Sequence, residues 1–578
     1  MKPIDFFTTP LSVPQRHYEA LRAHFVDGLS VEDAAAKFGL AASYFKKLRH
    51  EFTAGLRKGD APFFEARRPG PVKPRTPAET AAMVVSLRKR NLAVTDIKAA
   101  LEAQGIKLAL STIDVILKKE GFAPLPKRTR RERREGLFPR KIEAAPSVPL
   151  EFLNEEFTTE RGAGALCLLP IIERLGIVPA IEAAGFPETS ALSAAQSVLS
   201  LLALKLTGSA RWSHDEGWNF DRALGLFAGL NVLPKSTALS TYSYRVGRES
   251  VRRFLKALAG IFTDPADGGD FNLDFKAIPH WGDESVLEKN WSGSRNKAIK
   301  SLLGLIVQAP ASGMLSYTDA ELKHADQNGA VLDFVDFWKD GGGPAPKMLI
   351  FDSKFTTYQN LDRLNRDPAG IKFLTLRRRG KALVEQAGRI PAAEWRSVNV
   401  ERARGGRTTL RVHDGPCALR GYEGQVRQLI LADNGRLKPA FLITNDFEAS
   451  PAALVHKYAG RWLVEQEIAE QVAFFHLNNP SSSIVIKVDF DLALSLLAHN
   501  LYRTLARELH GFERCTVPTL HRKFLENGAH IKIDGRNITV ALKKKTHLPI
   551  LLAAPSLKTP TALSWMGSTI SFSPAAYS

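Results

Sequence analysis

The chain has 578 residues, of which 44% are apolar, and its formal net charge is +19 at pH 7. This length exceeds the size at which one hydrophobic core keeps growing, so we expect a globular protein of several domains. A positive surplus of this size indicates a phosphate-rich partner, and by itself it does not choose among DNA, RNA and anionic lipid.

Membrane, secretory and cysteine signals are weak. No run approaches the roughly 18 apolar residues that a membrane span needs, and the start MKPIDFFTTPL lacks the regions of a signal peptide. We therefore expect a cytoplasmic protein. Cys167, Cys417 and Cys515 lie far apart without metal-ligand spacing, so neither a disulfide framework nor a zinc knuckle is expected. Any metal would need oxygen ligands.

The first 60 residues show the rhythm of a helix-turn-helix unit. Apolar residues recur at helical spacing from Val13 to Leu56, interrupted at Gly28 and Gly39, which predicts three short helices. Ser30 followed by Asp33 resembles a capping box for the middle helix. The predicted recognition helix runs from Ala41 to Phe52. Its polar residues are Ser43, Lys46, Lys47, Arg49 and His50.

A second helix-turn-helix unit is predicted over residues 77–125. Thr76 and Pro77 supply a cap and a first-turn proline for one helix, and Thr95 starts another. The third helix would be the recognition helix, from about Thr112 to Glu120, and it carries Lys118 and Lys119. The alternative for either trio is an ordinary three-helix packing unit.

Two basic segments flank the second unit. The linker 61–76 contains RRPGPVKPRTP, where Arg68 and Arg75 suit an extended arm in a DNA minor groove. The linker 126–160 contains KRTRRERREGLFPRK, where Arg130 and Arg131 suit phosphate contacts. The alternative for both is a solvated linker. Residues 161–265, rich in Ala and Leu, are predicted to form a helical subdomain without visible chemistry.

Strand patterns begin at Asp270. DFNLDFKAIP, SLLGLIVQAP and MLSYTDAEL predict three strands of a meander, followed by a helix from Gly329 to Lys339 and a buried strand, KMLIFDS. This order is the start of a ribonuclease-H-like fold, in which the first and fourth strands are neighbours. Asp274 and Asp352 would then lie close together.

A third carboxylate is expected on a later helix, Val455 to Phe475. There Tyr458, Arg461 and Glu465 lie at i, i+3 and i+7, on one helix face. Three carboxylates can hold two Mg²⁺ ions about 3.5–4 Å apart for an in-line phosphodiester displacement. Asp274 is assigned to both ions, and Asp352 and Glu465 to one each, so these three are the predicted catalytic and metal-binding residues. Mn²⁺ can substitute for Mg²⁺.

Each assignment has an alternative. An acid at a strand end is commonly a turn former, and Arg461 with Glu465 can be an ordinary helix-surface pair. Asp283, in the segment HWGDES, is a rival for the first acid.

The segment FLITND, followed after about a dozen residues by YAGRWLVEQEI, resembles the end of the catalytic core of bacterial insertion-sequence transposases with an Asp-Asp-Glu triad. Their Tyr-x-x-Arg-x-x-x-Glu signature is matched by Tyr458, Arg461 and Glu465. The resemblance covers roughly Asp270 to Ala506. The sequence departs from the family pattern at Val472, where a Lys is frequent, and after Asp352, where x-Gly is frequent and Ser353 and Lys354 stand here.

The resemblance implies a catalytic domain built from residues 266–355 and 440–510, with a β-rich insertion at 356–439. Strands are predicted there at 372–379, 398–402, 409–413 and 428–432. In that family the insertion contacts DNA, which implies a similar role for Arg377, Arg378 and Arg379. Residues 511–578 are taken as a C-terminal tail region, and its last part, Thr546 to Ser578, shows no informative pattern.

The fold class expected from the sequence is therefore multidomain α+β. The expected function is metal-dependent strand cleavage and strand transfer at the ends of an insertion sequence, with double-stranded terminal-repeat and target DNA as partners. A homodimer in a synaptic complex, near the bacterial nucleoid, is implied by the resemblance alone. Tyr458 and Arg461 are expected to contact DNA, and Tyr458 or Trp462 to stack on a base. The alternative for Trp462 is packing in the core. The alternatives are a sequence-specific DNA-binding regulator derived from a transposase, and a structure-selective nuclease.

Overall fold

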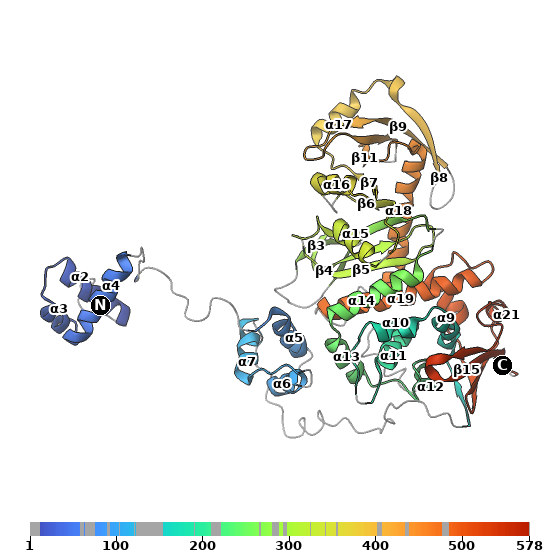
Figure 1. Ribbon diagram of the computed structural model, residues 1–578, viewed down its shortest axis with the longest axis horizontal. Coiled ribbons are helices and arrows are strands. Elements are labelled where there is room, and N and C mark those ends of the chain that lie inside the picture. The colour runs from blue at the N-terminus through green and yellow to red at the C-terminus, as the bar shows by residue number, and fades with distance from the viewer. Residues whose placement is uncertain are drawn as a thin grey trace. The chain divides into compact units, whose positions relative to one another are not determined.

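Figure 1 shows the computed structural model of the chain. It describes residues 12–57, 63, 76–89, 93–102, 105–120, 122, 154–189, 191–209, 221–264, 267–279, 288–292, 297–323, 325–341, 343–353, 357–401, 407–433, 438–476 and 485–576. Within these ranges some side chains, including those of 462–472, are not described. The chain divides into two compact units, Met1–Thr80 and Ala81–Ser578, which are treated separately below.

The first unit contains the predicted helix trio. Its helices are α2 (Val13–Phe25), α3 (Val31–Lys37) and α4 (Ala42–Arg57). The Ser30 hydroxyl accepts a hydrogen bond from the Asp33 amide at 3.1 Å, which is the cap that the sequence predicted. Gly28 and Gly39 take positive φ values of 73° and 63° in the two turns, where a Cβ would be strained. Ala20, Leu21, Ala34, Ala35 and Phe45 form its small core.

Another trio lies at the start of the second unit: α5 (Ala78–Lys89), whose first turn precedes the boundary, α6 (Val94–Glu102) and α7 (Leu110–Lys119). Helices are predicted from the sequence at these places. Its core joins Val84, Ile97, Leu101, Ile113 and Leu117. Tyr244 also enters this core, and its hydroxyl lies 3.0 Å from that of Ser86. The trio therefore packs on the helical part of its own unit.

That helical part carries most of the apolar core. It consists of η1 (Ala163–Leu168), α9 (Leu169–Arg174), α10 (Ile177–Ala183), α11 (Ala194–Leu206), α12 (Arg222–Phe227), α13 (Ser236–Arg245), α14 (Arg248–Phe262) and α19 (Val485–Glu508). The buried Lys205 on α11 pairs with Asp491 on α19 at 2.9 Å. Among the described residues no single helix is long and apolar enough to cross a membrane. The helix pair Ala163–Arg174 and Ile177–Ala183, bent by 70°, is long and apolar enough when its two members are taken together.

A ten-stranded mixed sheet forms the middle of the second unit. Its strands run in the order β3-β4-β2-β6-β7-β11-β10-β9-β8, and β5 pairs with β4. The first part comprises β2 (Asp270–Pro279), β3 (Lys289–Ser292), β4 (Lys297–Gln308), β5 (Leu315–Leu322), β6 (Met348–Phe351) and β7 (Lys372–Leu376). β2 is antiparallel to β4 and parallel to β6, and β7 is parallel to β6.

The two faces of this sheet are covered by different helices (Figure 1). Leu349, Phe351 and Phe373 belong to the core cluster that also contains residues of α15 (Ala330–Asp340) and α16 (Tyr358–Asn365). Met348, Ile350 and Leu374 alternate with them and pack against α18 (Pro451–Phe474). The side chains that point toward α18 are therefore every second residue of β2, β6 and β7.

The sheet continues past β7 through β11 (Ala440–Thr444), β10 (Val426–Ala432), β9 (Arg407–Cys417) and β8 (Arg396–Glu401), with α17 (Lys381–Gly388) and η5 (Ala392–Glu394) in between. The predicted start of the insertion, at residue 356, is therefore too early in the chain. α16 and β7 belong to the sheet's parallel part, because β7 is the direct neighbour of β6, and the antiparallel extension follows only after β7.

The C-terminal segment forms a subdomain, which corrects the expectation of a tail. β12 (Ala529–Asp534), β13 (Asn537–Leu542), β14 (Thr561–Leu563) and β15 (Ser568–Pro574) join β1 (Glu155–Thr159) in a five-stranded mixed sheet. α20 (Val517–Leu520), a π-turn (His521–Leu525), α21 (Leu548–Leu552) and η7 (Ser564–Met566) complete it. Because β1 pairs with β12, the end of the expected linker 126–160 is part of this sheet.

Candidate active site

Acidic side chains of β2 face helix α18. Asp270, Asn272 and Asp274 alternate with Phe271 and Leu273, which belong to the core on the other face. Two cations of α18 contact the two aspartates. Lys457 Nζ lies 2.6 Å from Asp270 Oδ2, and Arg461 Nη1 lies 3.5 Å from Asp274 Oδ1. Lys457 and Arg461 are one helical turn apart, so this face of α18 runs along β2.

The pairing of β2 with β6 brings the two aspartates together. Asp270 pairs with Met348 and Asn272 with Ile350 in parallel register. The same register continued by two residues places Asp352, directly after β6, opposite Asp274 and on the same face. Neighbouring strands lie about 4.8 Å apart, so both carboxylates belong to one small area. The backbone amide of Ser353 donates a hydrogen bond to Asp352 Oδ1 at 2.6 Å.

Arg461 and Tyr458 lie inside the helix–sheet contact. Arg461 is 5% exposed, and its guanidinium carbon lies 5.4 Å from the centre of the Tyr458 ring. Tyr458 packs with Leu454 and Val455 of α18 in the apolar cluster formed with the sheet. Burial therefore gives Tyr458 a packing role in this structure, and the expected DNA contacts of Tyr458 and Arg461 stay predictions.

The third predicted acid lies farther along the same helix. Glu465 follows Arg461 by four residues, which is one turn of α18, but its side chain is outside the described part, as is that of Trp462. Asp283 is also outside it. Among the described residues no group of three or more His, Cys, Asp or Glu could hold a metal ion. Asp274 and Asp352 are among these described residues, and the carboxylate of Glu465 is not.

The donor set fits a hard divalent cation. Asp274 and Asp352 offer carboxylate oxygens, which Mg²⁺ and Mn²⁺ prefer, and the Asp274 carboxylate retains 24% exposure. Asn272, between Asp270 and Asp274 on the same face, is 1% exposed, and its amide has no hydrogen-bond partner among the described residues. Both acids have a cation of α18 beside them, but the Lys457–Asp270 pair is closer, at 2.6 Å, than the Arg461–Asp274 pair, at 3.5 Å.

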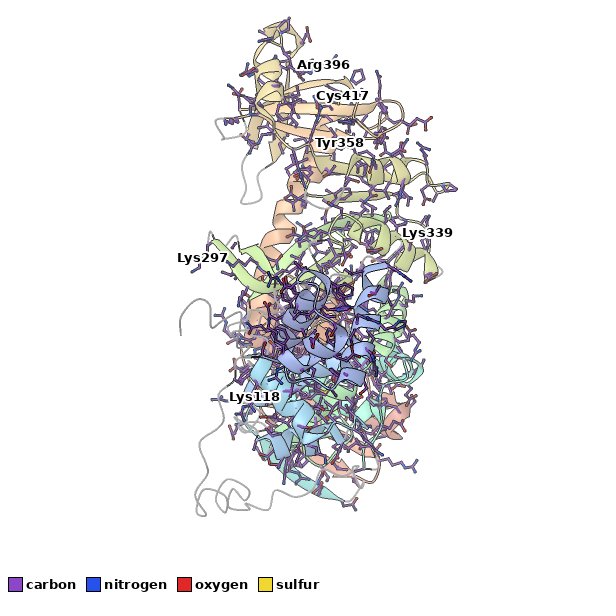
Figure 2. The ribbon with its side chains drawn as sticks, turned by 90° about the vertical axis from the view of Figure 1, so that its left-hand side faces the viewer. Lys118, Lys297, Lys339, Tyr358, Arg396 and Cys417 are labelled. Atoms are coloured by element: carbon purple, nitrogen blue, oxygen red, sulfur yellow. The ribbon has the colours of Figure 1, made fainter. Side chains whose placement is uncertain are left out.

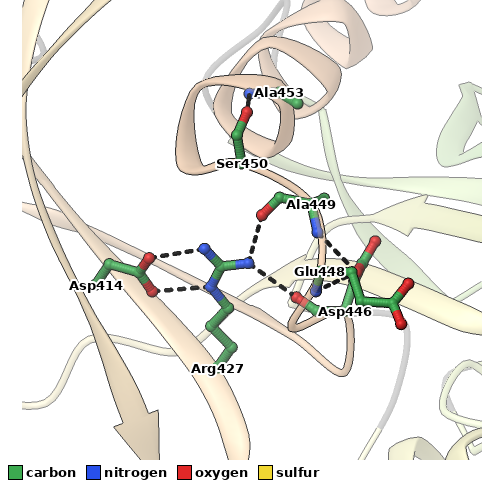
Figure 3. Close-up of polar contacts among 7 residues, drawn as sticks. All are labelled: Asp414, Arg427, Asp446, Glu448, Ala449, Ser450 and Ala453. Carbon is green, nitrogen blue, oxygen red and sulfur yellow. Dashed lines mark hydrogen bonds and ion pairs between the residues drawn. The ribbon is translucent and has the colours of Figure 1, made fainter.

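A buried arginine fixes the start of α18 (Figure 3). Arg427 on β10 is 8% exposed and binds Asp414 on β9 with two hydrogen bonds, at 2.9 and 2.7 Å. Its Nη1 also donates to the backbone carbonyls of Asp446 and Ala449, at 3.2 and 2.5 Å. The turn that leads into α18 is therefore tied to the antiparallel part of the sheet. Sequence patterns cannot reveal this role, because two of the partners are backbone atoms.

The α16 face carries a pocket near Asp352. It has a volume of about 290 Å³ and is lined by Ser353, Thr357, Tyr358 (labelled in Figure 2), Thr375 and Arg378, together with other residues. Arg377 is held inward, donating to Gln428 at 2.7 Å, whereas Arg379 is exposed. Of the three arginines expected to contact DNA, Arg378 and Arg379 remain accessible.

The recognition-helix cations lie on helix surfaces. Lys46 pairs with Glu32 at 3.1 Å and Lys47 with Glu51 at 3.8 Å, and all four side chains are more than half exposed. The Arg49 guanidinium lies 3.4 Å from a ring nitrogen of His24. Pairs as exposed as these are weak, so a phosphate can replace the acid.

In the second trio, Lys118 (labelled in Figure 2) pairs with Asp114 at 2.7 Å, and Lys119 is exposed. Arg68, Arg75, Arg130 and Arg131 lie outside the described residues.

Comparisons with known proteins find distant similarity among solved structures. No protein-family model matches the chain, and no curated protein matches it. A cryo-EM structure of the piggyBac transposase in a synaptic complex with hairpin DNA is similar over 60% of this chain and 78% of that chain, with 12% sequence identity and a TM-score of 0.34. A similarity of this degree does not assign the chain to a family.

Proposed function

We propose that the chain is a DNA transposase of the Asp-Asp-Glu class, which cleaves DNA at the ends of an insertion sequence and joins those ends to a target. One observation carries the proposal. Asn272 of β2 pairs with Ile350 of β6 in parallel register, and Asp274 and Asp352 each follow by two residues, so they are expected side by side, near the helix that bears Tyr458, Arg461 and Glu465. Arg461 contacts Asp274 directly, which links the sequence signature to the acids.

The strand order supports the same function. Five strands of the sheet can be numbered one to five in chain order: β2, β4, β5, β6 and β7. Their order across the sheet is three-two-one-four-five. The first three are antiparallel and the last two are parallel to the first, with helices α15 and α16 as crossovers. This is the order of ribonuclease-H-like domains, in which strands one and four carry two of the catalytic acids.

Each residue has a definite task in this proposal. Asp274 would contact both metal ions, and Asp352 and Glu465 would complete one site each. Bound Mg²⁺, or Mn²⁺, supplies activation of the attacking oxygen and stabilisation of the leaving one. Arg461, whose Nη1 lies 3.5 Å from Asp274 Oδ1, would orient this carboxylate. Lys457 neutralises Asp270 and keeps it from competing for the ions.

The two helix trios and the basic linkers would supply DNA binding. Exposed Lys46, Lys47, Lys118 and Lys119 suit phosphate contacts, and a homodimer would hold two element ends together. These contacts position the DNA, since phosphate contacts alone carry no sequence information.

The alternative is a DNA-binding regulator in which the acids no longer act. The arrangement of Arg461 on Asp274 favours the enzyme, because a decayed site has no need of a buried guanidinium aimed at a partly exposed carboxylate. A structure-selective nuclease, the third possibility, would cut without a specific end sequence.

The test is Mg²⁺-dependent cleavage of the DNA that flanks the gene, by wild type and by Asp274→Ala, Asp352→Ala and Glu465→Ala. Cleavage at fixed ends by wild type, with binding but no cleavage by the three variants, is expected. Asp270→Asn is the matched control, because it removes a carboxylate on the same strand face that is paired with lysine. Binding without cleavage by wild type would favour the regulator, and cleavage at unrelated sequences would favour the nuclease.

A further inference from the structure

A shallow basic hollow lies in the C-terminal subdomain. This subdomain has its own sheet, separate from the sheet that contains β2 and β6. Its volume is about 520 Å³. Two segments form it, the π-turn after α20 and the loop between β13 and α21. The residues that line this C-terminal hollow are Arg522, Lys523, Lys544, Lys545, Thr546 and His547. Four of the six carry a permanent positive charge, and no carboxylate is among them.

The cations of the hollow differ from their neighbours in having no acidic partner. Lys543 pairs with Glu160 at 2.7 Å, and Lys532 pairs with Glu156 at 3.5 Å. In the part of the chain that the structure describes, none of the four hollow cations has a carboxylate oxygen within 4.0 Å. Like charges gathered without counter-charges repel one another, so this arrangement favours an anionic ligand.

The wall of the hollow is held in place by packing. Lys523 Nζ lies 4.8 Å from the centre of the Phe512 ring, and Lys545 donates to the backbone carbonyl of Glu526. The His547 ring packs edge-on against Phe512 at 5.4 Å between ring centres. Arg522 and Lys544 are exposed and have none of these supporting contacts. Two cations are therefore fixed, and two are available to reach a ligand.

We propose that the C-terminal hollow binds the sugar-phosphate backbone of duplex DNA, as a contact separate from the helix trios and from the acids. An open hollow with several spaced cations suits a chain of phosphates better than one small anion. The lining is entirely polar and offers no apolar side chain for insertion into a lipid surface. This inference rests on the proposed function only in taking DNA as the partner.

The experiment compares two double variants of the full-length protein. Arg522→Ala/Lys544→Ala removes the two available cations of the hollow. Arg536→Ala/Lys558→Ala removes one exposed arginine and one exposed lysine of the same subdomain outside the hollow, and is the matched control. Binding to a random-sequence duplex of about 60 base pairs is measured by fluorescence anisotropy between about 50 and 300 mM salt, where phosphate contacts set the salt dependence.

Each phosphate contact contributes about 0.9 to the slope of log K against log salt. The slope of log K against log salt is therefore expected to be smaller by about 1.8 for the hollow variant than for wild type. Its affinity near 0.1 M salt is expected to be lower by at least about tenfold. The control variant is expected to keep the wild-type slope. Equal slopes for the two variants would overturn the inference and leave the proposed function intact. If wild type binds no duplex at all, the proposed function fails as well.

Two further readouts complete the test. Both variants are expected to melt at the wild-type temperature, because all four side chains are exposed and outside the core. Binding to phosphatidylserine vesicles is measured in parallel. Loss of vesicle binding in the hollow variant, with DNA binding unchanged, would assign the hollow to lipid and overturn the proposal.

Discussion

The guanidinium of Arg461 lies 3.5 Å from a carboxylate oxygen of Asp274, and the two side chains are 6% and 24% exposed. The pair joins helix α18 to strand β2 at the place where the two aspartates meet. It places a cation beside an acid whose side chain is about one-quarter exposed. The same contact therefore joins the helix to the sheet at the acid that we propose as a metal ligand.

Arg461→Ala is expected to lower stability in the absence of metal by about 2 kcal/mol, since it leaves a partly buried carboxylate without its cation. Added Mg²⁺ should then raise the melting temperature of the variant more than that of wild type, because the ion replaces the missing charge. Thermal unfolding with and without Mg²⁺ measures both effects. Arg461→Lys, which keeps a charge, serves as the control. An equal Mg²⁺ effect in wild type and Arg461→Ala would contradict the proposed position of the metal.

Arg427→Met is expected to destabilise the second unit by about 3 kcal/mol. The substitution leaves Asp414 unpaired and removes two hydrogen bonds at the entrance of α18. Hydrogen exchange should become faster over residues 446–454 and remain unchanged in the helices of the first unit. Asp414→Asn is the milder comparison, because Arg427 keeps its two carbonyl partners. Unchanged exchange at the start of α18 would show that Arg427 does not position this helix.

His499 provides a pH test of the core. Burial lowers the pKa of this histidine from 6.5 to about 4, and its Nε2 lies 2.8 Å from the Gly313 carbonyl. Because the folded-state pKa is lowered, the contribution of neutral His499 is fully present above pH 6.5 and is lost as the pH falls toward 4. The loss amounts to at most about 3 kcal/mol.

His499→Gln keeps a donor for Gly313 and cannot titrate in this range. As the pH falls from 7.5 to 4.5, the melting temperature of wild type should therefore fall more than that of His499→Gln. Asp489, whose pKa burial raises to about 6, is present in both proteins and cancels in the difference. A difference that is independent of pH would show that His499 is not held neutral by the fold.

Local patterns in the sequence were enough to predict most helices and the central strands. Both helix trios, the meander, α15 and β6 lie within a few residues of their predicted positions, because each has clear periodicity or a cap. The expectation that Asp274 and Asp352 are neighbours rests on strand order alone, and the observed order of β2 beside β6 agrees with it. The hairpin strand β3 was missed, because its four residues are too short to show a period.

Long-range pairings could not be predicted. The C-terminal sheet depends on β1 pairing with β12, where Thr158 and His530 are 372 residues apart. One signal was available, since AHIKID alternates buried and exposed residues as a half-buried strand does. The role of Arg427 and the C-terminal hollow depend on contacts between segments that no local pattern joins.

Metal rescue of cysteine variants tests the triad most directly. Asp274→Cys, Asp352→Cys and Glu465→Cys should each lose cleavage in Mg²⁺ by about a hundredfold or more and recover part of it in Mn²⁺, which tolerates a thiolate ligand better. Asp270→Cys should cleave in Mg²⁺ much as wild type does. Full Mg²⁺ activity in any of the three triad variants would contradict its assignment as a metal ligand, and loss in Asp270→Cys with Mn²⁺ rescue would move the site to Asp270.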